Sequence, residues 1–112
     1  MNANIKAVPM DGAVDKLILS ADSASKFLKA LGHDGRLTIL CHLLGGPKSV
    51  TELENLLSAR QAVVSQQLAR LRLERLVAAR RDGNAIFYSI EDDKVRQTVV
   101  FLANLFEDGA YM

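Results

Sequence analysis

The single cysteine of the chain, Cys41, and its neighbour His42 are the residues whose types could support nucleophilic or redox chemistry. A thiolate is a nucleophile and a site of oxidation, and an imidazole can act as its base. Adjacent residues on a helix point about 100° apart, so His42 is poorly placed to activate the thiol. No orienting acid accompanies the pair. A thiol enzyme is therefore a poor hypothesis, and we expect no catalytic residues.

A second group of chemically distinctive side chains lies in residues 58–84. This segment contains six arginines and two acidic residues, a net charge of +4, whereas residues 85–112 carry −3 and residues 1–57 are neutral overall. The planar guanidinium group suits phosphate oxygens and guanine edges. The sequence therefore predicts a polyanion-binding surface in residues 58–84, with an ordinary solvated surface as the alternative.

The elements that precede this segment show helical hydrophobic spacing. The pattern predicts a flexible arm over residues 1–12 and one or two helices over residues 13–31, with a weak break near residues 20–25. Another helix follows and ends at Gly45-Gly46-Pro47. Its buried stripe is predicted to contain Leu37, Leu40, Cys41 and Leu44.

Two serine-led sequences predict the starts of two further helices. Ser49-Val-Thr-Glu52 has the form of a capping box, and Ser58-Ala-Arg-Gln61 repeats that form shortly afterwards. Two helices with almost no linker predict a helix-turn-helix over residues 49–75. The second helix is predicted to bury Val64, Leu68 and Leu71. Its outer side then carries small residues, amides and arginines in place of glutamate and lysine, so it is suited to close contact with another body.

After Leu76 the hydrophobic period shortens to about two residues. Two predicted strands within residues 76–90 flank Asp82-Gly83-Asn84, which favours a β-hairpin. The acidic residues 91–93 suit the start of a last helix. That helix is apolar around much of its girth, and so is the first one. Because one small domain cannot cover both, we expect a homodimer joined through the first and last helices.

This order of elements is typical of a winged-helix DNA-binding domain. We predict a mainly α (α+β) fold of order α-α-α-α-β-β-α, with one DNA-binding and dimerisation domain over residues 13–112 and a wing over residues 76–90. The residues predicted to contact double-stranded DNA are Arg60, Gln61, Ser65, Gln66, Gln67, Arg70, Arg80, Arg81, Gly83 and Asn84. No run approaches the ~18 apolar residues of a membrane span, and no signal peptide is recognisable, so we expect a cytoplasmic protein.

Four segments carry a more specific likeness. They are residues 27–41 (FLKALGHDGRLTILC), 64–72 (VSQQLARLR), 76–83 (LVAARRDG) and 86–89 (IFYS). Together and in this order they resemble the ArsR/SmtB family of small bacterial repressors, with the likeness extending from about residue 23 to residue 107.

The resemblance implies a homodimer that places two recognition helices in successive major grooves of a palindromic operator, on the bacterial nucleoid. It makes the helix from Ser58 to about Arg75 the recognition helix and residues 82–84 the wing. Gln61, Ser65 and Gln66 match the positions that the family usually turns toward DNA.

Within the family, Cys41 resembles a residue of thiol-based sensors that respond to persulfides or oxidants. In those relatives this cysteine pairs with another near the end of the last helix, but here Glu107 stands at about that place. Cys41 is therefore either an inert packing residue, whose burial would raise its pKa, or a single-thiol sensor. The metal-binding patterns of the family are missing, since the last helix contains no histidine, and His33 and His42 lie at different helical angles. We expect neither a metal nor a cofactor.

The sequence thus predicts a transcriptional repressor that oxidation or persulfidation of Cys41 could release from DNA. Two alternatives stay open. One is a repressor of the same fold in which Cys41 is only a core residue and no effector acts. The other is a winged helix used for protein interaction without DNA binding, which would show no salt-dependent DNA affinity.

Overall fold

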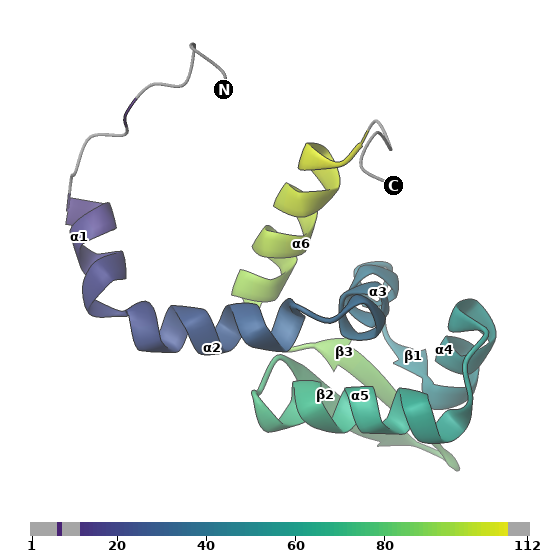
Figure 1. Ribbon diagram of the computed structural model, residues 1–112. Coiled ribbons are helices and arrows are strands. Elements are labelled where there is room, and N and C mark those ends of the chain that lie inside the picture. Colours follow the sequence, from purple (N-terminus) through teal and green to yellow (C-terminus); the bar gives the residue numbers. More distant parts are fainter. Residues whose placement is uncertain (1–6, 8–11, 108–112) are drawn as a thin grey trace.

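The computed structural model describes residue 7 and residues 12–107, and Figure 1 shows their arrangement. Its helices are α1 (Gly12–Leu19), α2 (Ala21–Leu31), α3 (Asp34–Leu43), α4 (Val50–Leu57), α5 (Gln61–Leu73) and α6 (Asp93–Leu105). Its strands are β1 (Lys48–Ser49), β2 (Val77–Asp82) and β3 (Ala85–Ile90). A helix-turn-helix followed by a hairpin and a last helix confirms the predicted mainly α class with a β wing. The predicted arm lies outside the described residues, apart from Ala7 and Gly12, and Gly12 begins α1.

The N-terminal pair of helices is divided at Ser20, at the beginning of the predicted break. The backbone N–H of Ser20 donates to the carbonyl oxygens of Lys16 and Leu17 at 3.0 Å each, so α1 closes before α2 begins. Helix α1 buries none of its residues, and α2 buries only Ala30 and Leu31 at its end. Most of the apolar surface of these two helices is therefore left uncovered by the described residues of the chain.

The core lies where α3, α4, α5, α6 and the start of the hairpin meet. Its fully buried large side chains are Ile39, Leu40, Leu43, Leu53, Val64, Leu68, Leu71, Val77, Val95 and Val99. The predicted buried side of α5 is confirmed. The stripe predicted for α3 is wrong in part, because Ile39 and Leu43 are buried with Leu40, whereas Cys41 is exposed.

The error on α3 has a physical cause. This helix is packed from two directions, with Ile39 beside residues of α4 and α5, and with Leu37 and Cys41 beside residues of α6. Spacings of three and four residues define a stripe along a helix, but they do not define which neighbouring element covers it.

The sheet has three antiparallel strands in the order β1-β3-β2 within the described residues. The hairpin closes through the pair Asp82 and Ala85, so Gly83 and Asn84 form a two-residue turn. Gly83 has a φ of 63° and Asn84 has a negative φ, which is the pattern of a type II′ turn with glycine first. The predicted hairpin is confirmed. Strand β1 was not predicted, because two residues are too few to show a period.

Helix α6 begins as its acidic start suggested. The Asp92 side chain accepts a hydrogen bond from the Lys94 backbone N–H at 2.9 Å and so caps the helix. Val95 and Val99 enter the core, while Phe101 remains 60% exposed and Phe106 51% exposed. In Figure 1, α1 and α6 project from one side of the molecule and the tip of the hairpin projects from the other. Across residues 7 and 12–107, no helix has both the length and the apolar character to span a membrane.

Candidate DNA-binding surface

The first helix of the helix-turn-helix, α4, starts with the predicted capping box. The Ser49 hydroxyl accepts from the Glu52 backbone N–H at 3.1 Å, and the Glu52 carboxylate accepts from the Ser49 backbone N–H at 2.9 Å. This reciprocal pair satisfies two backbone donors that a helix start leaves free. The start of α4 is therefore fixed locally.

The second predicted capping box is wrong. Ser58 ends α4 rather than starting α5, and it adopts a left-handed conformation with a φ of 51°. Arg60 is the N-cap of α5, and its side chain makes no capping hydrogen bond. The reason is the shortness of the connection: only residues 58–60 separate the two helices, so the chain must reverse at Ser58, which leaves its hydroxyl too early to cap α5.

The outer side of α5 is exposed and lacks acidic residues along its first turns. It carries Gln61, Ala62, Ser65, Gln66 and Ala69. Alanines let the helix approach another surface closely, while amide and hydroxyl groups can hydrogen-bond base edges. Arg60 is exposed at the N-terminal end of the helix, where the helix dipole also favours an anion. The exposed side of α5 therefore has the chemistry expected of a surface that meets a polyanion.

Two of the predicted DNA-contacting side chains of α5 interact with other side chains of the same chain. Gln67 is partly buried, and its side-chain oxygen accepts from Arg36 Nη1 at 3.4 Å, so it is turned toward α3. Arg70 Nε lies 3.8 Å from Glu74 Oε1, at side-chain exposures of 42% and 33%. An exposed pair of this kind is weak and can exchange its partner for a phosphate. Arg70 thus remains accessible to a phosphate, whereas the side chain of Gln67 does not lie on the exposed outer side of α5.

The hairpin presents Arg80, Arg81, Gly83 and Asn84, and all four are exposed. Side chains alternate between the two faces of a strand, so Arg81 shares a face with Val77 and Arg80 lies on the other. Val77 is buried against the helices. Arg81 therefore projects on the face of the sheet that carries the helices, and Arg80 on the opposite face.

Similarity to characterised proteins identifies this arrangement. The model of the bacterial regulatory protein arsR family matches residues 33–79, which include α3, the helix-turn-helix and the start of β2. The HTH-type transcriptional regulator YgaV of Escherichia coli is 39% identical over 92 residues, covering 81% of this chain and 93% of that protein. This chain belongs to the ArsR family. It is a transcriptional regulator with a winged helix-turn-helix domain, and the family is not one of enzymes.

Other members of the ArsR family agree in sequence and in fold. The transcriptional activator HlyU of Vibrio cholerae is 33% identical over 102 residues, covering 91% of this chain and 93% of that protein. The solved structure of the transcriptional repressor BigR from Xylella fastidiosa has a TM-score of 0.79 at 36% identity, covering 82% of this chain and 94% of that one. Activators and repressors thus share this architecture.

Cys41, the residue that resembles a family sensor thiol, is exposed in the single chain. It lines a small pocket of about 230 Å³ together with Leu37 of α3, with Val99, Leu102 and Ala103 of α6, and with Phe106, the C-cap residue of α6. Partial desolvation by its apolar neighbours raises the pKa of the Cys41 thiol, against a smaller opposite effect of a backbone hydrogen bond. This rise in pKa is the direction expected for an inert packing residue, but the expected burial in the core is wrong, because the side chain is exposed. Phe106, which follows α6 as its C-cap residue, lines this pocket with the thiol.

Two residues that position this ArsR-family surface were not predicted from the sequence. His33 caps α3, because its Nδ1 accepts from the backbone N–H groups of Gly35 at 3.1 Å and Arg36 at 3.4 Å. Histidine is not among the preferred capping residues, so this cap was not expected. The other is Arg36, whose contact with Gln67 spans 31 positions of the sequence and has no local signal. Among the described residues, no cluster of three or more His, Cys, Asp or Glu side chains could hold a metal ion.

Proposed function

We propose that the chain represses transcription as a homodimer that binds a palindromic operator in the bacterial cytoplasm. The observation that carries the proposal is the outer side of α5, where Gln61, Ser65 and Gln66 are exposed between small alanines on a helix opened by Arg60. In this proposal Gln66 contacts base edges in the major groove, and Arg70 contacts phosphates of the DNA backbone beside that groove. The wing contacts the DNA backbone or the minor groove through Arg80, Arg81, Gly83 and Asn84.

The dimer is supported by the apolar surface that α1, α2 and α6 leave uncovered. Leu19 is 88% exposed, and Leu28 and Phe101 are each 60% exposed. Exposed hydrophobic residues gathered on a few helices mark an interaction surface. A second copy of the chain offers the same surface, as a twofold interface requires. A dimer of this kind holds two copies of α5 at a fixed spacing, which is what a palindromic operator would match.

The test compares base reading with phosphate binding. A preferred operator is first selected from a random DNA library, and its affinity is then measured over a series of salt concentrations. Gln66→Ala should relax the base preference at one position and cost about 1–3 kcal/mol on the selected sequence. Arg81→Gln should weaken binding to all sequences alike and reduce the salt slope by about one.

A matched control lies on α6. Arg96→Gln makes the same change as Arg81→Gln at an exposed site outside the proposed DNA surface, and it should bind DNA as the wild type does. If the wild type selects no sequence and shows no salt-dependent affinity, the chain is a protein-interaction module and the proposal fails. Transcription in vitro from a promoter containing the operator then separates repression from activation.

A second proposal concerns regulation through Cys41. Oxidation or persulfidation of the thiol would add polar atoms between α3 and α6, and so alter the packing of α6. It is supported by the exposure of the thiol and by its place beside Val99 and Phe106. Operator binding by wild type and Cys41→Ser, each reduced, peroxide-treated or persulfide-treated, tests it. Equal affinities in all six samples would leave a repressor in which this cysteine senses nothing.

A further inference from the structure

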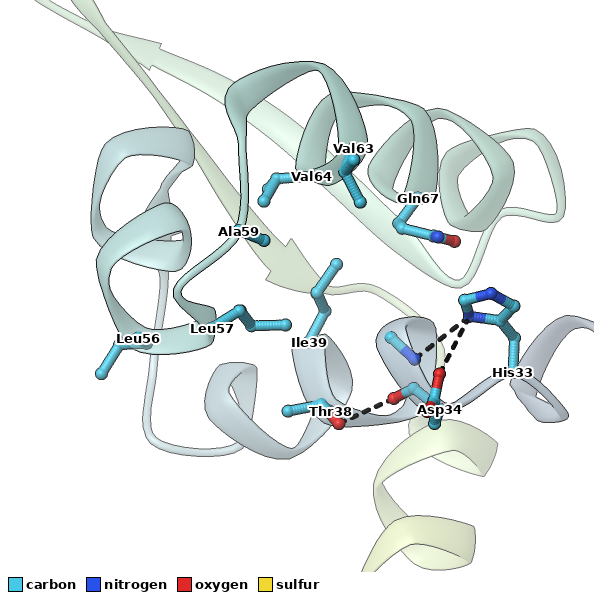
Figure 2. A pocket seen from close by; sticks show the side chains of 11 residues that line it. His33, Asp34, Thr38, Ile39, Leu56, Leu57, Ala59, Val63, Val64 and Gln67 are labelled. Atoms are coloured by element: carbon cyan, nitrogen blue, oxygen red, sulfur yellow. Dashed lines mark hydrogen bonds and ion pairs between the residues drawn. The ribbon is translucent and has the colours of Figure 1, made fainter.

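A pocket of about 420 Å³ opens between the start of α3, the end of α4 and the first half of α5 (Figure 2). Its size falls within the range of about 300–1,000 Å³ that is typical of small-molecule sites. It shares no lining residue with the pocket beside Cys41. It is therefore a separate feature of the molecule, next to the helix proposed to bind DNA.

The walls of this pocket are mostly apolar. Ile39 and Val64 form its buried floor, and Leu57 lines it from α4. At its rim, Leu56 is 48% exposed and Val63 is 46% exposed. These two side chains belong to different helices and leave apolar surface in water that an occupant could cover. Covering them would contribute about 25 cal/mol for each square ångström removed from water.

One end of the pocket is polar, and its hydrogen-bonding groups are defined. Because His33 Nδ1 accepts two backbone N–H groups, the neutral ring carries its proton on Nε2, which is a donor. Gln67 offers its side-chain oxygen, which is held only by a 3.4 Å hydrogen bond from Arg36. Figure 2 shows the amide of Gln67 turned toward the ring of His33. A hydroxyl group at this end could accept from His33 and donate to Gln67.

The charge of the lining restricts the occupant further. Asp34 is the one carboxylate among the lining residues, its side chain is fully exposed, and neither lysine nor arginine lines the pocket. An anionic molecule would meet this carboxylate without a compensating cation, while its own charge lost water. The lining therefore suits a neutral molecule with an apolar body and one hydroxyl group.

The pocket is linked to the rest of the molecule through Arg36. Arg36 Nε donates to the Ala30 carbonyl at 2.6 Å and Nη2 donates to the Lys29 carbonyl at 3.0 Å, so the same guanidinium joins the end of α2 to Gln67 of α5. The contact with Gln67 is the longest of the three. A hydroxyl group that donates to Gln67 would compete with it and loosen α5 from α2.

We propose that this pocket is an effector site for a small neutral apolar molecule bearing a hydroxyl group, and that its occupancy weakens DNA binding. The binding part stands on the pocket alone. The regulatory part rests on the proposed DNA-binding function, because the occupant contacts α5 through Val63, Val64 and Gln67. An effector that changes affinity at a second site typically does so by about 5–150-fold.

The probe for this site is 2-naphthol, a neutral fused aromatic with a single hydroxyl group. In the whole 112-residue chain, labelled at isoleucine, leucine and valine methyl groups, NMR titration should give saturable shifts that begin at Ile39, Leu56, Leu57, Val63 and Val64. Under the same conditions, affinity for the selected operator should fall at least about fivefold. Both effects should saturate at the same probe concentration.

A filled pocket provides the decisive comparison. Thr38 lines the pocket, is exposed, and uses its hydroxyl only on the Asp34 carbonyl at 2.7 Å, so Thr38→Phe should fill the space without disturbing the core. Thr51→Phe makes the same change at an exposed site of α4 outside the pocket. The first variant should lose both responses to 2-naphthol, and the second should keep them.

The possible results test the ligand site and its effect on DNA binding separately. Methyl shifts that persist in Thr38→Phe, or that centre on α1, α2 and α6, overturn the site. Shifts confined to the pocket with unchanged operator affinity overturn the regulatory part and leave the site. If the protein without probe has no DNA affinity, the proposed function has failed, and the methyl shifts still decide whether the pocket binds.

Discussion

The half of the molecule built from α4, α5 and the hairpin exposes different side chains from the half built from α1, α2 and α6. On the first half, Gln66 and Arg81 face solvent, whereas on the second Leu28 and Phe101 do. An ordinary solvated helix carries mainly glutamate and lysine, and neither half does so on these surfaces. The difference indicates that each half is suited to its own partner: a polyanion for the first and an apolar surface for the second.

One side chain hydrogen-bonds to both halves. Arg36, at the start of α3, hydrogen-bonds the carbonyl oxygens of Lys29 and Ala30 on α2 and the side chain of Gln67 on α5. Through this contact the position of the apolar helices is tied to that of the helix proposed to bind DNA. The two halves therefore carry two specialised surfaces, and Arg36 joins these halves. Each surface can be altered separately by substitution.

The largest effect is expected from a charge on the apolar half. Phe101→Glu should weaken dimerisation by about 2 kcal/mol or more, at least 30-fold, because an aromatic anchor is lost and a carboxylate would be buried unpaired. Sedimentation analysis measures the dimer. Operator affinity should fall with it, although α6, the helix that carries Phe101, projects from the opposite side of the molecule to the hairpin tip (Figure 1).

The control for this change is Arg96→Glu on the same helix. Arg96 is five residues from Phe101 and points about 140° away from it, so its replacement adds negative charge outside the apolar surface. It should leave the dimer intact. A Phe101→Glu protein that remains dimeric at micromolar concentration would show that α6 does not form the interface.

The next largest effect is expected at Arg36, which joins the two halves. Arg36→Lys keeps the positive charge but cannot donate to three acceptors on two helices, since an ammonium group lacks the planar fork of a guanidinium. We expect the free energy of unfolding to fall by about 2 kcal/mol, measured by urea denaturation. Arg96→Lys, at an exposed site of α6, should change it by less than about 0.5 kcal/mol. Equal stabilities of the two variants would mean that Arg36 does not join the halves.

A smaller effect separates the two serines that begin similar sequences. Ser49→Ala removes a capping hydroxyl and should cost about 1 kcal/mol of unfolding free energy. Ser58→Ala should cost much less, because the Ser58 hydroxyl does not cap α5. Ser58→Gly should stabilise the protein by about 0.5–1 kcal/mol, because glycine adopts a φ of 51° without strain. Thermal unfolding of all three variants checks this ranking.

These serines also show how far the sequence could predict the fold. Periodicity located the buried side of α5 because one core covers that helix from one direction. The capping pattern located the start of α4, but it failed at Ser58, because the same four residues can end one helix when the connection is short. The two-residue strand β1 depends on pairing with Tyr88 and Phe87, which lie far along the chain.

The candidate site was predictable to the extent that it is local. The exposed row on α5 and the hairpin turn follow from helix and strand periods. The inward turn of Gln67 does not, because it depends on Arg36, and neither does the pocket, whose walls come from three helices. The packing direction of α3 was equally hidden, so Cys41 was expected in the core and is instead exposed beside α6.

The smallest effect is expected at Cys41, which lies on α3 beside residues of α6. Apolar neighbours raise the pKa of the thiol, so at a given pH below that pKa a smaller fraction is thiolate than in an unstructured peptide. Alkylation by iodoacetamide should therefore be several-fold slower in the folded protein than after unfolding in urea at pH 7–8. The folded-state rate should rise with pH and reach half its maximum at a higher pH than the unfolded chain does. Because the folded state holds the proton more tightly, the contribution of this group to stability is complete below the unfolded pKa and declines as pH rises through the folded pKa. A folded-state profile shifted to lower pH would instead indicate an activated thiol, and it would favour sensing by Cys41 over inert packing.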